Sequence, residues 1–95
     1  MATYDQWLDA FSTFYDSIPR DAGLPCLNCG QKTLRLVFTG YPERMIGYGH
    51  FWCDTCLVGI GICRAPIPEG AVMQNIHDAP EDREPKIPNF QLVQG

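Results

Sequence analysis

The first twenty residues place apolar side chains at steps of three and four, which is the period of an α-helix with one buried face. These apolar positions are Tyr4, Trp7, Leu8, Phe11, Phe14, Tyr15 and Ile18. Thr3 and Gln6 stand three apart ahead of this run, as in a capping box, and Pro19 cannot continue a helix. We therefore predict an amphipathic helix over residues 1–20, which must cover the sheet that follows.

Three later segments alternate apolar and polar residues, which is the period of a β-strand. They are "KTLRLVFTG" at 32–40, "YGHFWC" at 48–53 and "LVGIGICRAPI" at 57–67. The stretch "GYPERMIGYG" at 40–49 joins the first two segments and is rich in glycine and proline, which indicates a loop there. The predicted fold is α+β, with a small antiparallel sheet covered on one face by the N-terminal helix.

The third strand segment has a branched face and a glycine face. Gly59 and Gly61 alternate there with Val58, Ile60 and Ile62. Glycine weakens a strand unless another group approaches closely. We therefore expect the aromatic rings of the helix to pack against the two glycines. The tail or a second subunit should then cover part of the opposite face, which we expect to present Leu36, Trp52, Val58 and Ile60.

Residues 68–95 contain four prolines and no sustained period. Within them "DAPEDREP" has the composition of a solvated linker, whereas "IPNFQLV" is apolar enough to dock as an extended strip or a short edge strand. The predicted organisation is one folded domain made of a helix (1–20), a metal-binding sheet (21–67) and an extended proline-rich tail (68–95).

The formal charge of −4 is spread unevenly along the chain. Residues 26–64 carry four basic and two acidic side chains, whereas the segments before and after them are both acidic. Four thiolates around one divalent ion would cancel this central excess. Because such a balance does not form a phosphate-binding surface, no nucleic-acid partner is expected.

The N-terminus lacks both the basic region and the continuous apolar region of a signal peptide, and no apolar stretch reaches the length of a membrane span. We therefore expect a cytoplasmic protein with no membrane association. In that reducing compartment cysteines serve metals or catalysis more often than disulfides.

Two C-x-x-C pairs, Cys26 with Cys29 and Cys53 with Cys56, are separated by 23 residues. Each such turn presents two sulfurs from one tight loop, and two loops at the ends of adjacent hairpins close a tetrahedral site. Gly30 directly follows the first pair, where such turns need a positive φ. The spacing predicts a metal site with four cysteine ligands.

The segments "CLNCG" at 26–30 and "FWCDTC" at 51–56 resemble the zinc-ribbon superfamily, with rubredoxin-like knuckles. The resemblance covers about residues 24–67. It implies a three-stranded sheet and one structural zinc ion held by Cys26, Cys29, Cys53 and Cys56. Two positions depart from the family pattern: Leu27 replaces a frequent proline, and Leu57 replaces a frequent glycine.

Two other chemistries are open to the same cysteines. Iron in a rubredoxin-like site would make the protein an electron carrier, and the spacing is common to both metals. A redox-active C-x-x-C is disfavoured, because thioredoxin-like chemistry needs the motif at the start of a helix within a βαβ unit.

The remaining cysteine and the histidines are interpreted as structural. Cys63 stands seven residues after Cys56, about 23 Å along an extended strand, and is expected to pack as a small apolar residue. His50 precedes Cys53 by three residues but is not needed by a site that four thiolates fill. His77 has no partner in the sequence pattern.

No nucleophile–base pair, phosphate loop or paired-carboxylate motif is present in the sequence, so no catalytic or cofactor-binding residues are predicted and the protein is not expected to be an enzyme. The favoured function is a structural-zinc protein acting as a protein-interaction module, and its own copy is one possible partner. The alternatives are a transcription-associated ribbon that binds nucleic acid and, less favoured, a rubredoxin-like iron electron carrier.

Overall fold

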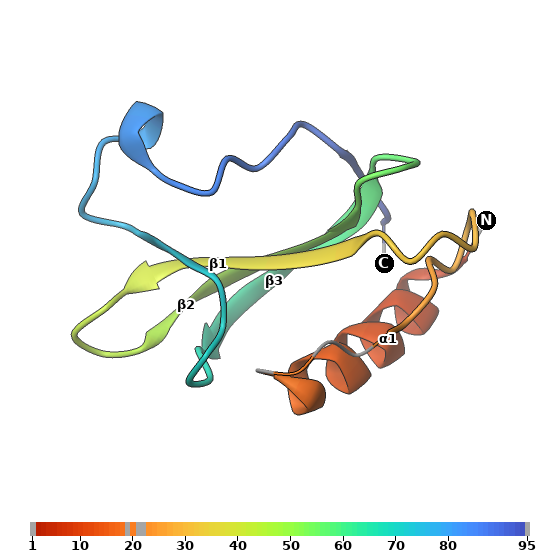
Figure 1. The fold of residues 1–95 in the computed structure, drawn as a ribbon, viewed down its shortest axis with the longest axis horizontal. Coiled ribbons are helices and arrows are strands. Elements are labelled where there is room, and N and C mark those ends of the chain that lie inside the picture. Colours follow the sequence, from red (N-terminus) through yellow and green to blue (C-terminus); the bar gives the residue numbers. More distant parts are fainter. Residues whose placement is uncertain (1, 19, 21–22, 95) are drawn as a thin grey trace.

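The computed structural model describes residues 2–18, 20 and 23–94. One face of a β-sheet is covered by the N-terminal helix, and the C-terminal segment runs along the other (Figure 1). In chain order the elements are α1 (Tyr4–Ser17), β1 (Leu34–Tyr41), β2 (Ile46–Cys53), β3 (Val58–Pro66), β4 (Met73–Asn75), the 3-10 helix η1 (Pro80–Asp82) and β5 (Gln91–Leu92). The chain is therefore α+β.

The sheet is mixed, with the strand order β4-β1-β2-β3-β5. Its central strands β1, β2 and β3 are antiparallel neighbours, as the sequence predicts. The expectation of a purely antiparallel sheet is wrong, because β4 pairs in parallel with β1 and β5 pairs in parallel with β3. Both extra strands come from the segment predicted to be a proline-rich tail, and β5 lies within "IPNFQLV", the part expected to dock as an extended strip or a short edge strand. They are two and three residues long, too short to show a strand period.

The helix begins where its capping box places it. The Gln6 backbone N–H donates to the Thr3 hydroxyl at 3.2 Å, and the Thr3 N–H donates to the Gln6 side-chain oxygen at 2.8 Å. These two bonds satisfy N–H groups that a helix start leaves unpaired. The helix ends at Ser17, and Pro19 lies outside the described residues.

The core between helix and sheet is built around Phe51, a fully buried residue of β2. Three rings of α1 meet its ring edge to face: the centroids of Trp7, Phe11 and Phe14 lie 5.7, 6.0 and 5.4 Å away. Such pairs add to the large apolar area that aromatic rings bury. The helix thus covers the face of the sheet that carries Phe51 and its neighbour Ile60.

The predicted packing of the helix on Gly59 and Gly61 is wrong. A side chain at Gly59 would collide with the Phe51 carbonyl and Trp52 of the neighbouring strand, so this glycine permits close strand pairing. A side chain at Gly61 would meet no atom within 4 Å. The helix packs on the face of β3 that carries Val58 and Ile60, because this face has more apolar surface to bury than the glycine face has.

The opposite, outer face is partly covered by the C-terminal segment. The rings of Trp52 and Phe90 stack with centroids 5.6 Å apart. Further along, the buried Gln74 of β4 accepts a hydrogen bond from the Thr39 hydroxyl at 2.8 Å and donates to the Pro85 carbonyl at 2.6 Å. The tail covers this face as expected, but Trp52 is the only one of the four residues predicted to lie there that does so.

No helix in the described part of the chain has both the length and the apolar character needed to cross a membrane.

Candidate metal centre

The four cysteines of the two C-x-x-C pairs come together at one end of the sheet. Cys26 and Cys29 lie in the loop before β1, whereas Cys53 ends β2 and Cys56 lies in the turn to β3. Pairing of Leu34 with Cys53 brings the start of β1 beside the second loop. All four sulfur atoms lie within 4.8 Å of one another.

The sulfur spacing suits a metal ion and not disulfides. The Sγ atoms of Cys26 and Cys56 are 3.6 Å apart, as are those of Cys29 and Cys53. A disulfide bond is about 2.05 Å long. Sulfurs at the corners of a tetrahedron with bonds of about 2.3 Å are separated by about 3.8 Å, which is close to the observed spacing. Four cysteines in this arrangement can bind a metal ion.

The two loops share one backbone conformation. The Gly30 N–H donates to the Cys26 carbonyl at 3.0 Å, and the Leu57 N–H donates to the Cys53 carbonyl at 2.9 Å. Both donors have positive φ, 78° at Gly30 and 53° at Leu57. The second loop therefore keeps the same geometry without a glycine, with the Leu57 side chain exposed to water.

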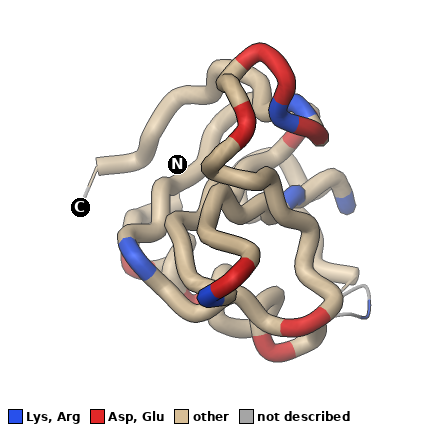
Figure 2. The backbone as a smooth tube through the Cα atoms, turned by 90° about the vertical axis from the view of Figure 1, so that its left-hand side faces the viewer, with Lys and Arg blue, Asp and Glu red and all other residues tan. Residues whose placement is uncertain are grey.

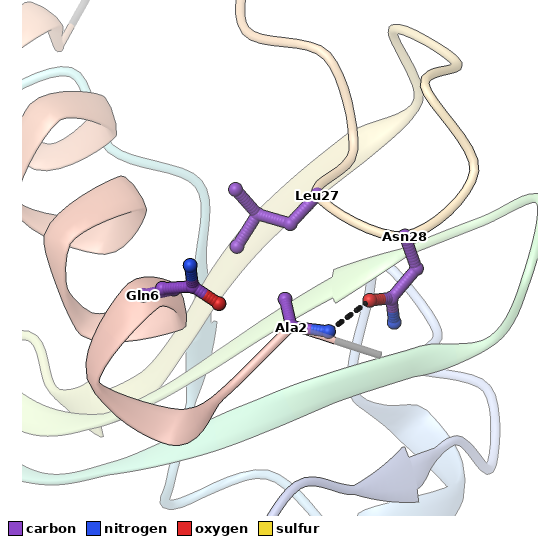
Figure 3. Close-up of a pocket in the computed structure, with 4 residues that line it drawn as sticks. All are labelled: Ala2, Gln6, Leu27 and Asn28. Atoms are coloured by element: carbon purple, nitrogen blue, oxygen red, sulfur yellow. Dashed lines mark hydrogen bonds between the residues drawn. The ribbon is translucent and has the colours of Figure 1, made fainter.

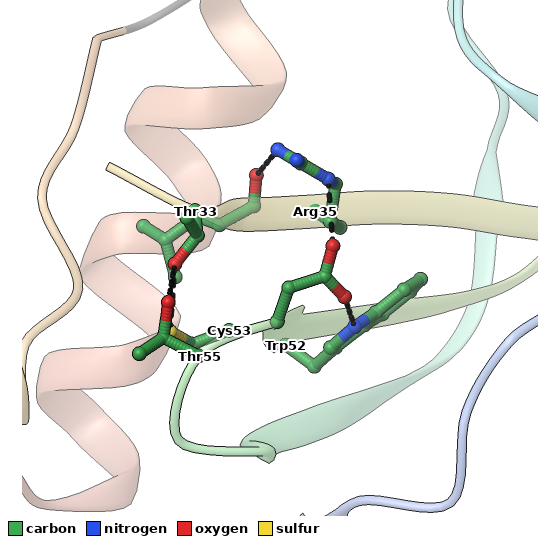
Figure 4. Close-up of polar contacts among 7 residues, drawn as sticks. Thr33, Arg35, Trp52, Cys53 and Thr55 are labelled. Atoms are coloured by element: carbon green, nitrogen blue, oxygen red, sulfur yellow. Dashed lines mark hydrogen bonds and ion pairs between the residues drawn. The ribbon is translucent and has the colours of Figure 1, made fainter. Parts of the chain in front are cut away.

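The site is sheltered on one side only. Cys26 and Cys53 are buried, Cys56 is half-buried and Cys29 is exposed. The Thr33 hydroxyl lies 3.2 Å from the Cys53 sulfur and 2.7 Å from the Thr55 hydroxyl (Figure 4). Sequence reasoning missed Thr33, although its place just before the strand opposite Cys53 was a signal for it.

The environments of two sulfurs shift their pKa values in opposite directions. Burial alone would raise the pKa of Cys53, but the Thr33 hydroxyl and the backbone N–H groups of Cys56 and Thr55 lower it to about 6. Burial and hydrogen bonds to Cys26 and Cys53 raise the pKa of Cys56 to about 12. The surroundings of Cys53 thus favour its thiolate form and those of Cys56 its thiol form, and binding of a metal ion by both sulfurs would release the Cys56 proton.

The second loop is fixed to β1 by a polar cluster on the outer face. Asp54 accepts a hydrogen bond from the Trp52 indole at 2.7 Å and forms an ion pair with Arg35 at 3.0 Å (Figure 4). Its backbone N–H also donates to the Thr33 carbonyl at 2.9 Å. These contacts hold the residue between Cys53 and Cys56 in place.

The first loop is joined to the start of α1. The Ala2 backbone N–H donates to the Asn28 side-chain oxygen at 2.8 Å, and Gln6 and Leu27 line the same hollow (Figure 3). Asn28 also donates its own N–H to the Cys26 sulfur at 3.4 Å. The helix and the cysteine loop therefore support each other through a residue that the sequence analysis did not single out.

The fifth cysteine and the histidines lie away from this cluster. Cys63 is exposed on β3, so its expected packing as a small apolar residue is wrong; among the described residues, the tail strand β5 pairs with Val58 and Gly59, several positions before Cys63. His50 lies on the outer face, 3.2 Å from the Thr39 hydroxyl, and burial lowers its pKa. His77 lies 2.9 Å from Glu43.

No protein-family model, curated protein or solved structure matches this chain.

Proposed function

We propose that Cys26, Cys29, Cys53 and Cys56 bind one zinc ion per chain, and that the ion holds the two loops of a zinc-ribbon-like sheet together. The single observation behind this proposal is the convergence of the four sulfurs within 4.8 Å. Closed four-cysteine sites in proteins are most often structural zinc sites, which favours zinc over iron. With all four positions used by protein ligands, the ion has no open position for substrate.

We further propose that the protein is a non-enzymatic, cytoplasmic protein-interaction module. Four thiols that must remain reduced to bind metal favour a reducing compartment. The histidine contacts favour structural roles: the Thr39 hydroxyl beside His50 is buried and donates its proton to Gln74, not to the imidazole, and His77 meets Glu43. Exposed apolar side chains remain on several loops and strands, including Tyr48, Met45 and Leu92.

Metal analysis of the purified full chain tests the zinc proposal. We expect one zinc per chain, no visible absorption of an iron tetrathiolate, and a Cys26→Ser variant that loses both zinc and its cooperative melting transition. Structural zinc contributes about 10–16 kcal/mol of apparent binding energy in zinc-finger peptides, enough to decide folding at this size. A well-folded protein without metal would contradict the proposal. A red, iron-containing protein would instead favour the alternative of a rubredoxin-like electron carrier.

A further inference from the structure

We propose that a groove at the far end of the sheet from the cysteine cluster binds an acidic peptide segment of a partner protein. This inference rests on the proposed role in protein interaction and supplies the chemistry of the partner. The groove has a volume of about 300 Å³. It is lined by Tyr41, Arg44, Ile46, Gly47, Tyr48, Arg64 and Ile76.

The groove combines the end of one hairpin with the neighbouring strand. Tyr41 ends β1, Tyr48 lies near the start of β2, and Arg64 comes from β3. A register shift between β2 and β3 at this point places Arg64 beside Tyr48. Cys53 ends the same β2 strand, so the groove and the cysteine cluster occupy opposite ends of the sheet.

The two arginines of the groove form no ion pair with a carboxylate in the described part of the chain, although Arg44 is close enough to its neighbour Glu43 to help lower the pKa of that carboxyl. Within residues 2–18, 20 and 23–94, neither Arg44 nor Arg64 lies within 4.0 Å of an acidic oxygen, whereas Arg35 pairs with Asp54. The Arg44 guanidinium lies 5.6 Å from the centre of the Tyr41 ring, which holds it at the groove. Unpaired guanidinium groups match the two oxygens of a carboxylate.

The tyrosines supply apolar contact surface beside these charges. Tyr41 and Tyr48 are 37% and 44% exposed, so both rings leave apolar surface in contact with water. Ile46 and Ile76, both half-buried, provide apolar surface in the same groove. Tyrosine and arginine are among the side chains most enriched where protein interfaces gain their binding energy.

The surrounding charge favours a peptide over a nucleic acid. His77 contacts both Tyr41 and Glu43, and an acidic segment, residues 78–84, follows it directly. Acidic and basic positions are interspersed on the side of the molecule that Figure 2 presents. A continuous row of phosphates would meet these acidic groups, whereas a peptide with one or two carboxylates can use the arginines alone.

Selection from a phage-displayed library of random 12-residue peptides on the zinc-loaded full chain tests the inference. We expect enriched peptides to carry one or more acidic residues next to a large apolar one. A synthetic copy of the most enriched peptide should bind the Arg44→Gln/Arg64→Gln variant at least tenfold more weakly than the wild type. The Arg20→Gln/Lys32→Gln variant, which loses the same charge elsewhere, should bind as the wild type does.

Enriched peptides without acidic residues would overturn the inference, and so would an equal loss of affinity in both variants. Two other binding modes would also overturn it. One is arginine-dependent binding of a uridine oligonucleotide in place of peptides, and the other is self-association that the Arg44→Gln/Arg64→Gln change abolishes. Zinc content is measured in the same samples. Zinc-loaded protein that selects no acidic peptide removes the groove proposal alone, whereas protein without zinc removes the metal proposal.

Discussion

At the scale of single residues, the two cysteine loops depend on positive φ at the position after each pair. Gly30 adopts this conformation freely, whereas Leu57 adopts it against the preference of residues with a side chain. The first loop therefore follows the local sequence, and the second must be held by its surroundings. Contacts of Asp54 with Trp52 and Arg35 provide that support.

Replacing Gly30 by alanine should lower the free energy of unfolding of the zinc-loaded protein by about 1–2 kcal/mol. A methyl group there would meet no atom within 4 Å, so the cost is conformational and not steric. Gly61→Ala is the matched control, because its side chain also points into open space but its φ is not positive. Equal denaturation midpoints for the two variants would contradict this account.

Thr33→Val should weaken zinc binding by roughly 10–100-fold, as loss of a group that orients a metal ligand commonly does. The valine keeps the shape but removes the hydroxyl that lies 3.2 Å from the Cys53 sulfur and lowers its pKa. Competition with a chromophoric chelator measures the affinity. Thr55→Val is the control, because its hydroxyl contacts Thr33 and not a sulfur; a similar loss in both variants would remove the special role of Thr33.

At the scale of elements, the helix and the sheet meet chiefly through Phe51. Three rings of α1 surround this one side chain, while the C-terminal segment adds a single stack of Phe90 on Trp52. The two layers on either side of the sheet are therefore unequal. The helix side has the more apolar core, with Trp7, Phe38, Phe51 and Ile60 fully buried, although Trp7 is the one α1 residue that is completely buried.

Phe51→Ala should cost about 3–5 kcal/mol of unfolding free energy, the range for removing a buried aromatic ring. Phe90→Ala removes the same group from a half-buried position and should cost clearly less. Chemical denaturation of both zinc-loaded variants provides the comparison. If Phe90→Ala were the more damaging change, the tail and not the helix would complete the core.

At the scale of the whole molecule, a chain of hydrogen bonds joins the sheet to the tail. The His50 ring nitrogen lies 3.2 Å from the Thr39 hydroxyl, which donates to Gln74, and Gln74 donates to the Pro85 carbonyl. Because the Thr39 hydroxyl proton is used on Gln74, the Nε2 atom of His50 must be the donor in its contact. Residues 50 and 85 are thereby linked across the outer face.

The partial burial of His50 predicts a pH dependence of stability. Burial lowers the pKa of His50 below the ordinary value of 6.5. The unfolded chain then binds the proton more readily, so the His50 contribution is complete above about pH 6.5 and is lost as the pH falls through the folded pKa. The fall in melting temperature from pH 7.5 to 5.5 should be smaller in His50→Gln than in the wild type. An equal fall in both would show that other groups govern the effect.

Local patterns in the sequence were sufficient for the helix, its capping box, the three central strands and the convergence of the two cysteine pairs. The helix follows from a period of 3.6 residues, the strands from a period of 2, and the capping box from a side chain three residues from a backbone N–H. Each cysteine pair follows from two thiols on one turn. Bringing the two cysteine pairs together required a contact between distant parts of the chain, and the antiparallel pairing of β1 with β2 provides that contact.

The tertiary structure alone decided which face the helix covers, that β4 and β5 join the sheet in parallel, that Cys63 is exposed, and that Tyr41, Tyr48 and two arginines share one groove. The physical reason is the same in each case. A short strand has no period of its own, and the choice between two faces of a sheet depends on how much apolar area each can bury against distant segments. The sequence by itself determined the helix, the three central strands and the meeting of the four cysteines, and packing determined which surfaces stay exposed.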